Sequence, residues 1–346
     1  MARTSFVTIF DDRYPLRPVK AFEVLCLVSS WACHVRPHSA VPLYVHVVRP
    51  THTALLEAIQ AAGALLVTHE KPHDLHVYSG TFNKLLALRD QEKTEARILL
   101  DNDVAFVRDV PDLLEQARHH VMANVADKQR APDEIVDEIR QTLGLDLIPH
   151  TWEPWQGKYQ AAIDGKPAPT VRGLYFNSGV VASPMNSRLA ELWQRHATMI
   201  CGHFQQRFPR HMQKSAFGSD QLPLSTAIAE HGTFKLLPVE FNYRVFNFRQ
   251  GECSADRIGI VHQVGLKQYE HTAFDGGGSY DAHSLVQHYY QGFMLDVIAT
   301  DSLGRKQERQ EAVSHARDSV STALTRCGFR DLADFGIETA TSPDPV

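Results

Sequence analysis

The chain has 346 residues, of which 43% are hydrophobic and 22% are charged, so it can bury a sizeable core as one large domain or two intimate ones. Its formal net charge is −5, and its lysines and arginines form no cluster along the sequence. Nucleic-acid-binding proteins usually concentrate basic residues on one face, so the composition argues against a nucleic-acid partner.

The first third of the chain alternates between strand-like and helix-like patterns. Short apolar runs rich in β-formers indicate strands, and longer stretches with apolar residues on one face indicate helices. Strands that alternate with helices favour a mostly parallel sheet with helices on both faces. In such sheets, ligands bind beyond the carboxyl ends of the strands. The predicted strands cover residues 6–10, 41–48, 65–68 and 98–100, and the predicted helices cover residues 19–31, 51–62 and 81–93.

The rest of the chain is less regular. Residues 126–170 contain one predicted helix, 133–143, and a stretch rich in Pro, Gly and Trp that we interpret as a long loop or insertion. A predicted strand over 173–182 is followed by Ser183 and Pro184, which suit the cap and the first position of a helix. The remaining predictions are a helix that begins near Ser219 and ends at Gly232, strands over 234–237 and 258–261, and a helical region from about Ser284 onward.

Cysteine usage and the first residues bear on the cellular compartment. The number of cysteines is odd and none are spaced as a CxxC pair, which suggests neither a disulfide scaffold nor a zinc site. Residues 1–10 hold no apolar run long enough for a signal peptide or a membrane span. We therefore expect a cytoplasmic protein without a transmembrane segment. The cysteines are Cys26, Cys33, Cys201, Cys253 and Cys327.

Two carboxylates flank one residue directly after the predicted strand at 98–100. Asp101 and Asp103, separated by Asn102, offer paired hard oxygen ligands, which suit Mg²⁺ or Mn²⁺. An ion held in this way keeps open positions for the phosphate oxygens of a substrate. The alternative is a polar turn between two strands, in which Asp and Asn are common.

A second segment places Asn177, Ser178 and Gly179 inside a strand pattern. Glycine in a strand often marks the close approach of a ligand or of another backbone. The alternative is a bulge that has no partner.

Two further segments place polar residues next to regular elements. Asp220 and Gln221 lie at a predicted helix start, where Asp is also favourable simply as a cap. His262 directly follows an apolar strand, and Gly265 and Lys267 lie close enough in sequence to meet a phosphate. A lone His is more often structural than a ligand, so this segment alone leaves both interpretations open.

The order and spacing of these segments resemble those of GT-A-fold glycosyltransferases, and most closely glycosyltransferase family 8, which includes glycogenin and bacterial lipopolysaccharide galactosyltransferases. The resemblance runs from about Phe6 to Lys267. It implies an α/β fold of the GT-A type, with a Rossmann-like, mostly parallel central sheet flanked by helices, to which this chain adds a helical C-terminal extension. The segments that carry the resemblance are Asp11-Asp12-Arg13-Tyr14, Thr81-Phe82-Asn83-Lys84, Asp101-Asn102-Asp103, Phe176-Asn177-Ser178-Gly179, Ser219-Asp220-Gln221, Leu237-Pro238 with Phe241-Asn242-Tyr243, and His262 with Gly265.

The resemblance also implies roles for individual residues. Asp101, Asp103 and His262 are expected to hold Mn²⁺ or Mg²⁺. Tyr14 is expected to stack on the uracil of a UDP-sugar donor. The other residues expected to bind the nucleotide sugar are Asp11, Asp12, Lys84, Asn102, Asn177, Ser178, Gly179, Gly265 and Lys267.

The implied activity is the metal-dependent transfer of a hexose, glucose or galactose, from its UDP-sugar to an acceptor that the sequence does not identify, with retention of anomeric configuration. Asp220 and Gln221 are the candidate catalytic residues, which would orient the sugar and stabilise its charge. Two alternatives remain at this stage. One is a non-catalytic protein that binds a nucleotide sugar or a glycan, and the other is a metal-dependent nucleotidyltransferase or sugar-nucleotide hydrolase.

The predicted domain organisation follows the resemblance. Residues 1–283 are expected to form the GT-A domain, with a nucleotide-binding half at about 1–125 and a sugar and acceptor half at about 170–283. Residues 284–346 are expected to form the helical C-terminal extension.

Overall fold

The computed structural model describes the greater part of the chain, and every structural statement below concerns these residues. By number they are 3–12, 16, 18–77, 80–89, 94–126, 131–146, 149–152, 171–173, 175–204, 207, 220–244, 253–262, 281, 284–287, 290, 306–335 and 337.

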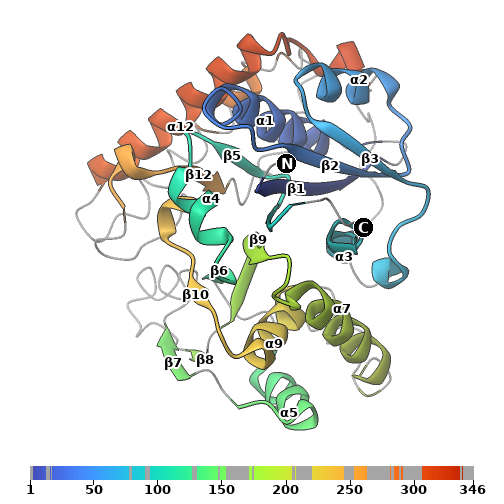
Figure 1. Cartoon of the computed structure of the whole chain (residues 1–346). Coiled ribbons are helices and arrows are strands. Elements are labelled where there is room, and N and C mark those ends of the chain that lie inside the picture. The colour runs from blue at the N-terminus through green and yellow to red at the C-terminus, as the bar shows by residue number, and fades with distance from the viewer. Residues whose placement is uncertain are drawn as a thin grey trace, which may run out of the picture.

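A seven-stranded sheet forms the centre of the molecule, with the strand order β10-β6-β9-β4-β1-β2-β3 (Figure 1). Strand β9 runs antiparallel to both of its neighbours, and the other neighbouring pairs are parallel. The predicted α/β fold with a mostly parallel central sheet is therefore confirmed. The strands are β1 (Thr4–Asp11), β2 (Leu43–Val48), β3 (Leu65–His69), β4 (Ala96–Leu100), β6 (Met122–Val125), β9 (Phe176–Pro184) and β10 (Lys235–Leu236).

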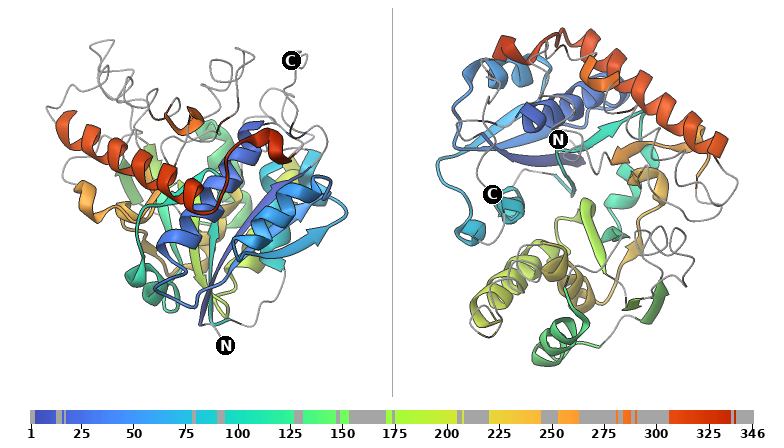
Figure 2. Two further views of the ribbon diagram at one scale, coloured as in Figure 1. Left: turned by 90° about the horizontal axis from the view of Figure 1, so that it is seen from above. Right: turned by 180° about the vertical axis from the view of Figure 1, so that it is seen from behind.

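Helices cover both faces of this sheet, because its central strands are apolar on both sides. In β4, Ile98 and Leu100 belong to one buried cluster and Leu99, which points to the opposite face, belongs to the other. Figures 1 and 2 show the helices divided into the same two layers. One layer contains α1 (Pro18–His34), α2 (Thr53–Ala61), α4 (Pro111–Ala117) and α12 (Lys306–Arg326), and the other contains α3 (Lys84–Arg89), α5 (Asp133–Leu143), α7 (Leu189–Met199) and α9 (Gln221–His231).

The C-terminal helix α12 is part of the main core. Its buried residues Val313, Val320 and Leu324 belong to the same hydrophobic cluster as α1, against which it packs (Figure 2). The hydroxyl of Ser319 lies 2.8 Å from Nε2 of His34. The predicted helical C-terminal extension is thus present, while the division of the chain at residue 283 stays a prediction.

A smaller sheet lies beside the central one and carries part of the candidate site. Strand β12 (Ile260–His262) pairs with β11 (Tyr243–Arg244) on one side and antiparallel with β5 (Val104–Phe106) on the other. A separate two-stranded sheet joins β7 (Pro149–Trp152) to β8 (Val171–Gly173). Short helical turns complete the described structure: η1 (Asp74–Val77), η2 (Gly80–Asn83), η3 (Ile200–Phe204), η4 (Val239–Phe241), η5 (Ala255–Arg257) and η6 (Leu332–Phe335).

Two sequence predictions about elements differ from the structure. The helix predicted over 81–93 begins as the 3₁₀ turn η2 and becomes α-helical in α3, and residues 90–93 lie outside the described residues. Ser183 and Pro184 do not start a helix, because β9 continues through them in register with Arg97 and Ala96. Pairing with a strand distant in sequence therefore overrides the local helix-start signal. The following helix, α7, begins only at Leu189.

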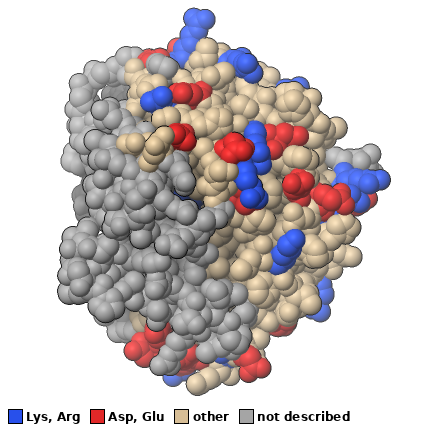
Figure 3. Space-filling model, turned by 90° about the vertical axis from the view of Figure 1, so that its left-hand side faces the viewer, with Lys and Arg blue, Asp and Glu red and all other residues tan. Residues whose placement is uncertain are grey.

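Charged side chains of both signs share the outer surface. On the face in Figure 3, acidic and basic side chains are interspersed on the described surface. Among the helices in the described ranges, none combines the length and the hydropathy that a membrane span requires.

Candidate active site

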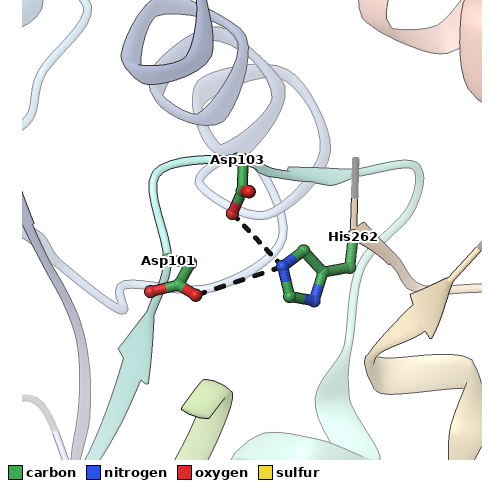
Figure 4. A group of neighbouring side chains, drawn as sticks. All are labelled: Asp101, Asp103 and His262. Atoms are coloured by element: carbon green, nitrogen blue, oxygen red, sulfur yellow. Dashed lines mark ion pairs between the residues drawn. The ribbon is translucent and has the colours of Figure 1, made fainter. Parts of the chain in front are cut away.

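Asp101, Asp103 and His262 converge at the carboxyl edge of the central sheet, as Figure 4 shows. Nε2 of His262 lies 3.2 Å from Oδ1 of Asp103 and 4.0 Å from Oδ2 of Asp101. Two ligands that each lie about 2.1 Å from a shared ion are themselves about 3–4.2 Å apart. The two carboxylates and the imidazole could therefore hold one metal ion.

Strand pairing explains why residues so distant in sequence meet. Asp101 and Asp103 lie in the turn between β4 and β5. Strand β12 pairs antiparallel with β5, and this register places His262 opposite Val104. The hydrogen bonds between β12 and β5 therefore hold His262 next to Asp103. This pairing fixes the position of the imidazole more firmly than a loop would.

The antiparallel strand β9 brings a second group of residues to the same edge. Because β9 runs against β4, its first residues lie beside the carboxyl end of β4. The backbone N–H of Asp101 donates to the carbonyl of Gly179 over 2.8 Å. The segment Asn177-Ser178-Gly179 thus lies directly next to the Asp101 turn.

Gly179 allows the imidazole of His262 to approach the strand closely. A Cβ atom built on Gly179 would lie 2.2 Å from Cε1 and 2.6 Å from Nδ1 of His262. No other residue type fits at this contact without displacing the ring. The glycine does mark a close approach, but to a side chain of the same site.

Asparagine side chains hold the other nitrogen of this imidazole. Nδ1 of His262 lies 2.9 Å from Oδ1 of Asn242. Nδ2 of Asn242 donates to Oδ1 of Asn177 over 3.1 Å, and the same oxygen accepts the backbone N–H of Gly179 over 2.9 Å. All three side chains are buried.

Lys84 connects the carboxylates of the site. Its Nζ lies 2.5 Å from Oδ1 of Asp101 and 2.8 Å from Oδ2 of Asp220, and it donates to Oγ of Ser178 over 3.0 Å. Burial alone would lower the pKa of Lys84, but the charges of Asp101 and Asp220 outweigh it and raise that pKa above its ordinary value. The lysine is therefore a fixed positive charge at the centre of the site.

Asp101 lies close to two other carboxylates, those of Asp103 and Asp220, which disfavour its negative charge. Burial raises the pKa of Asp101, and the negative charges of Asp103 and Asp220 raise it further, although Lys84 opposes this effect. Lys84 pairs with two of these three carboxylates, so the group keeps an excess of negative charge, which a divalent cation would compensate.

Asp220 and Gln221 lie at the start of α9, and both are buried. The side chain of Asp220 makes no capping hydrogen bond and is instead paired with Lys84. The indole Nε1 of Trp193 donates to the backbone carbonyl of Asp220 over 3.2 Å, which fixes the helix start. The capping alternative therefore does not describe this carboxylate, and its place beside Lys84 joins it to the Asp101 group.

The two acids at the end of β1, Asp11 and Asp12, form hydrogen bonds and ion pairs within the protein. Asp11 forms an ion pair with Arg49, whose Nε lies 2.9 Å from Oδ1. Asp12 is fully buried, and its Oδ2 accepts the backbone N–H groups of Thr51 and His52 over 2.6 and 2.9 Å, just before α2 begins. Oδ1 of Asp12 lies 2.6 Å from Nδ1 of His52. Their expected role in binding the nucleotide sugar stays a prediction.

Three predicted residues, Tyr14, Gly265 and Lys267, lie outside the described residues. Asn102 lies in the turn between Asp101 and Asp103 and is partly exposed. No finding tests the predicted roles of these four residues in donor binding.

Lys20 is a charged neighbour that the sequence patterns did not single out. Its Nζ lies 2.5 Å from Oε2 of the buried Glu23, on the same helix α1. Burial lowers the pKa of Lys20, but the charges of Glu23, Asp103 and Asp101 together raise it, so its ammonium lies in the field of the Asp101 turn. The available signal was a charged pair inside an otherwise apolar helix, which also resembles an ordinary surface pair.

The comparison with known families identifies the class of protein. A mostly parallel α/β fold with paired carboxylates at its carboxyl edge is the architecture predicted for a glycosyltransferase. The sequence profile of the family described as "Rhodobacterales glycosyltransferase domain" matches residues 32–232, more than half of the chain. The chain belongs to this family, and the prediction of a glycosyltransferase enzyme is confirmed. A search of curated proteins gave no significant match.

Several solved glycosyltransferase structures match the chain at low sequence identity and with TM-scores below 0.5. The galactosyltransferase LgtC in complex with donor and acceptor sugar analogs is 16% identical, over 83% of this chain and 95% of LgtC, with a TM-score of 0.48. The apo form of GlyE from Streptococcus pneumoniae TIGR4 is 11% identical, over 95% of this chain and 64% of GlyE, with a TM-score of 0.44. Mouse xyloside xylosyltransferase 1 is 16% identical, over 74% of this chain and 96% of that one, with a TM-score of 0.42. The enzyme class rests on the family and not on these likenesses.

Proposed function

We propose that this glycosyltransferase transfers glucose or galactose from a UDP-sugar to an acceptor, with retention, and that Asp101, Asp103 and His262 hold the Mn²⁺ or Mg²⁺ ion on which the reaction depends. The observation that carries the proposal is the convergence of these three side chains at distances that fit one ion. UDP and retention rest on the resemblance to family 8.

The site residues would act on a leaving group that gains negative charge. A bound divalent ion would stabilise the charge on the departing diphosphate as a Lewis acid. Lys84 adds a fixed positive charge beside Asp101, and its two carboxylate partners hold it in place. Such preorganised charge acts more strongly on the transition state than on the ground state, so it accelerates the transfer itself.

Asp220 and Gln221 would serve the sugar end of the donor. Lys84 contacts both Asp220 and Asp101, so a single side chain links the candidate sugar-binding carboxylate to a proposed metal ligand. We assign Asp220 to orienting the sugar and stabilising its developing positive charge. Asn177, Ser178 and Gly179 would support donor binding through the contacts that they make with His262 and Lys84.

The test is a screen of sugar nucleotides with Mn²⁺, Mg²⁺ or EDTA, in which the released nucleotide is identified with and without candidate acceptors. Release of UDP from UDP-glucose or UDP-galactose, dependent on the ion and increased by an acceptor, supports the proposal. Release of UMP would contradict it, because cleavage between the phosphates is the reaction of a sugar-nucleotide hydrolase. The anomeric configuration of the product, determined by NMR, decides between retention and inversion.

A further inference from the structure

The hydrogen bonds behind His262 determine which ring nitrogen carries the proton. A backbone N–H can only donate, so the atom of Asn177 that faces Gly179 N is its oxygen. That oxygen can only accept, so the atom of Asn242 that faces it over 3.1 Å is the amide nitrogen. The backbone N–H of Gly179 therefore determines the orientation of the Asn242 amide, through the side chain of Asn177.

The same reasoning extends to the imidazole. With its nitrogen turned to Asn177, Asn242 presents its oxygen to Nδ1 of His262 at 2.9 Å. An amide oxygen only accepts, so Nδ1 carries the proton. In the neutral ring, Nε2 then has the free lone pair, and it is Nε2 that faces Asp101 and Asp103.

We infer that Asn242 is a positioning residue, which locks His262 in the Nδ1–H tautomer and so keeps Nε2 ready to bind the metal. Asn242 is fully buried, and its side chain contacts Asn177 and His262. It would therefore act through His262 and not on the substrate. Outer partners of this kind typically change metal affinity by about 10–100-fold. The inference rests on the proposed metal site.

The first measurement requires no metal. In metal-free protein, ¹⁵N NMR of the His262 ring over a pH series distinguishes the two tautomers of the neutral imidazole. We expect the Nδ1–H form in the unmodified chain and in Asn242→Asp, which keeps an acceptor at this position. We expect a mixture in Asn242→Ala, which removes it. An Nε2–H ring in the unmodified protein would overturn the inference.

The second measurement is Mn²⁺ affinity by electron paramagnetic resonance without nucleotide. Asn242→Ala should weaken Mn²⁺ binding by about 10–100-fold. Asn242→Asp keeps the acceptor for Nδ1–H of His262 but loses the donor to Asn177, so it should weaken Mn²⁺ binding less than Asn242→Ala does. Asn124→Ala, which removes a buried amide of β6 whose side-chain contacts are to Leu237 and Arg244, is the control and should leave affinity unchanged. Equal losses in both Asn242 variants would mean a merely structural role and overturn the inference. If the unmodified chain binds no Mn²⁺, the proposed metal site fails, and the tautomer result alone decides the role of Asn242.

Discussion

Gly179 packs so closely against His262 that a Cβ atom would lie 2.2 Å from Cε1 of the imidazole. Gly179→Ala should displace the ring from Asp103, weaken Mn²⁺ binding by at least about tenfold and lower the free energy of unfolding by about 1–3 kcal/mol, as overpacking does. Mn²⁺ titration and urea unfolding measure both effects. Gly202→Ala is the control, because a Cβ atom there meets nothing within 4 Å. Unchanged Mn²⁺ affinity in Gly179→Ala would remove His262 from the metal site.

Lys84 is expected to hold two carboxylates together in the metal-free protein. Lys84→Gln leaves the buried Asp220 and the half-buried Asp101 without their ammonium partner, which should cost about 3–5 kcal/mol of unfolding free energy. Because Mn²⁺ would supply the missing positive charge, its addition should raise the melting temperature more in this variant than in the unmodified chain. The exposed Lys235→Gln serves as the matched control. Equal Mn²⁺ effects in all three proteins would contradict the close coupling of Lys84 to the metal ligands.

The pH dependence of Mn²⁺ binding follows from Asp101. Burial and its neighbouring carboxylates raise the pKa of this group, so protons compete with the ion at higher pH than for an ordinary Asp. Mn²⁺ affinity should therefore fall as the pH falls through this raised pKa. Asp220→Asn removes one of the charges that raise the pKa and should move the fall to lower pH. Affinity that stays constant down to about pH 4, the ordinary range of Asp, would contradict the prediction.

The same shift has a consequence for the stability of the metal-free protein. Between the unfolded pKa of Asp101 and its higher folded pKa, the folded state binds more protons than the unfolded state. The free energy of unfolding should therefore decrease as the pH rises through this window. Denaturant unfolding in EDTA over a pH series measures this contribution, which should disappear in Asp101→Asn.

A variant of Asp220 distinguishes a role in orienting the sugar from a role in binding the nucleotide. Asp220→Asn should lower the transfer rate by about a hundredfold, typical of one lost preorganised polar contact, while the affinity for UDP barely changes because UDP lacks the sugar. Calorimetric UDP titration and the transfer rate are measured on the same preparation. A normal rate would remove Asp220 from catalysis. A parallel loss of UDP affinity would mean that Asp220 shapes the whole pocket.

Much of the site could be predicted from the sequence because it lies where strands end. Asp101 and Asp103 follow an apolar strand, and the carboxyl edge of a parallel sheet is where ligands bind. His262 also ends a strand, and the resemblance to family 8 linked it to the two acids. The structure brings all three together.

The contacts that hold these residues could not be predicted, because they depend on strand pairing. The antiparallel direction of β9 places Gly179 against His262. Asn242 lies between η4 and β11, and the pairing of β11 with β12 places this asparagine behind the ring. No local pattern reveals these pairings. The same cause explains the failed helix start at Ser183, where β9 continues along β4.

The most direct test of the metal-dependent mechanism is the rate of UDP release from UDP-hexose in the presence of Mn²⁺, measured for the unmodified chain and for Asp103→Ala after thermal unfolding has shown that both are folded. Loss of the ion's contribution of several kcal/mol should lower the rate roughly a thousandfold in Asp103→Ala, and EDTA should have the same effect on the unmodified chain. Full turnover in EDTA, or in Asp103→Ala, would show that the reaction does not depend on the proposed metal site.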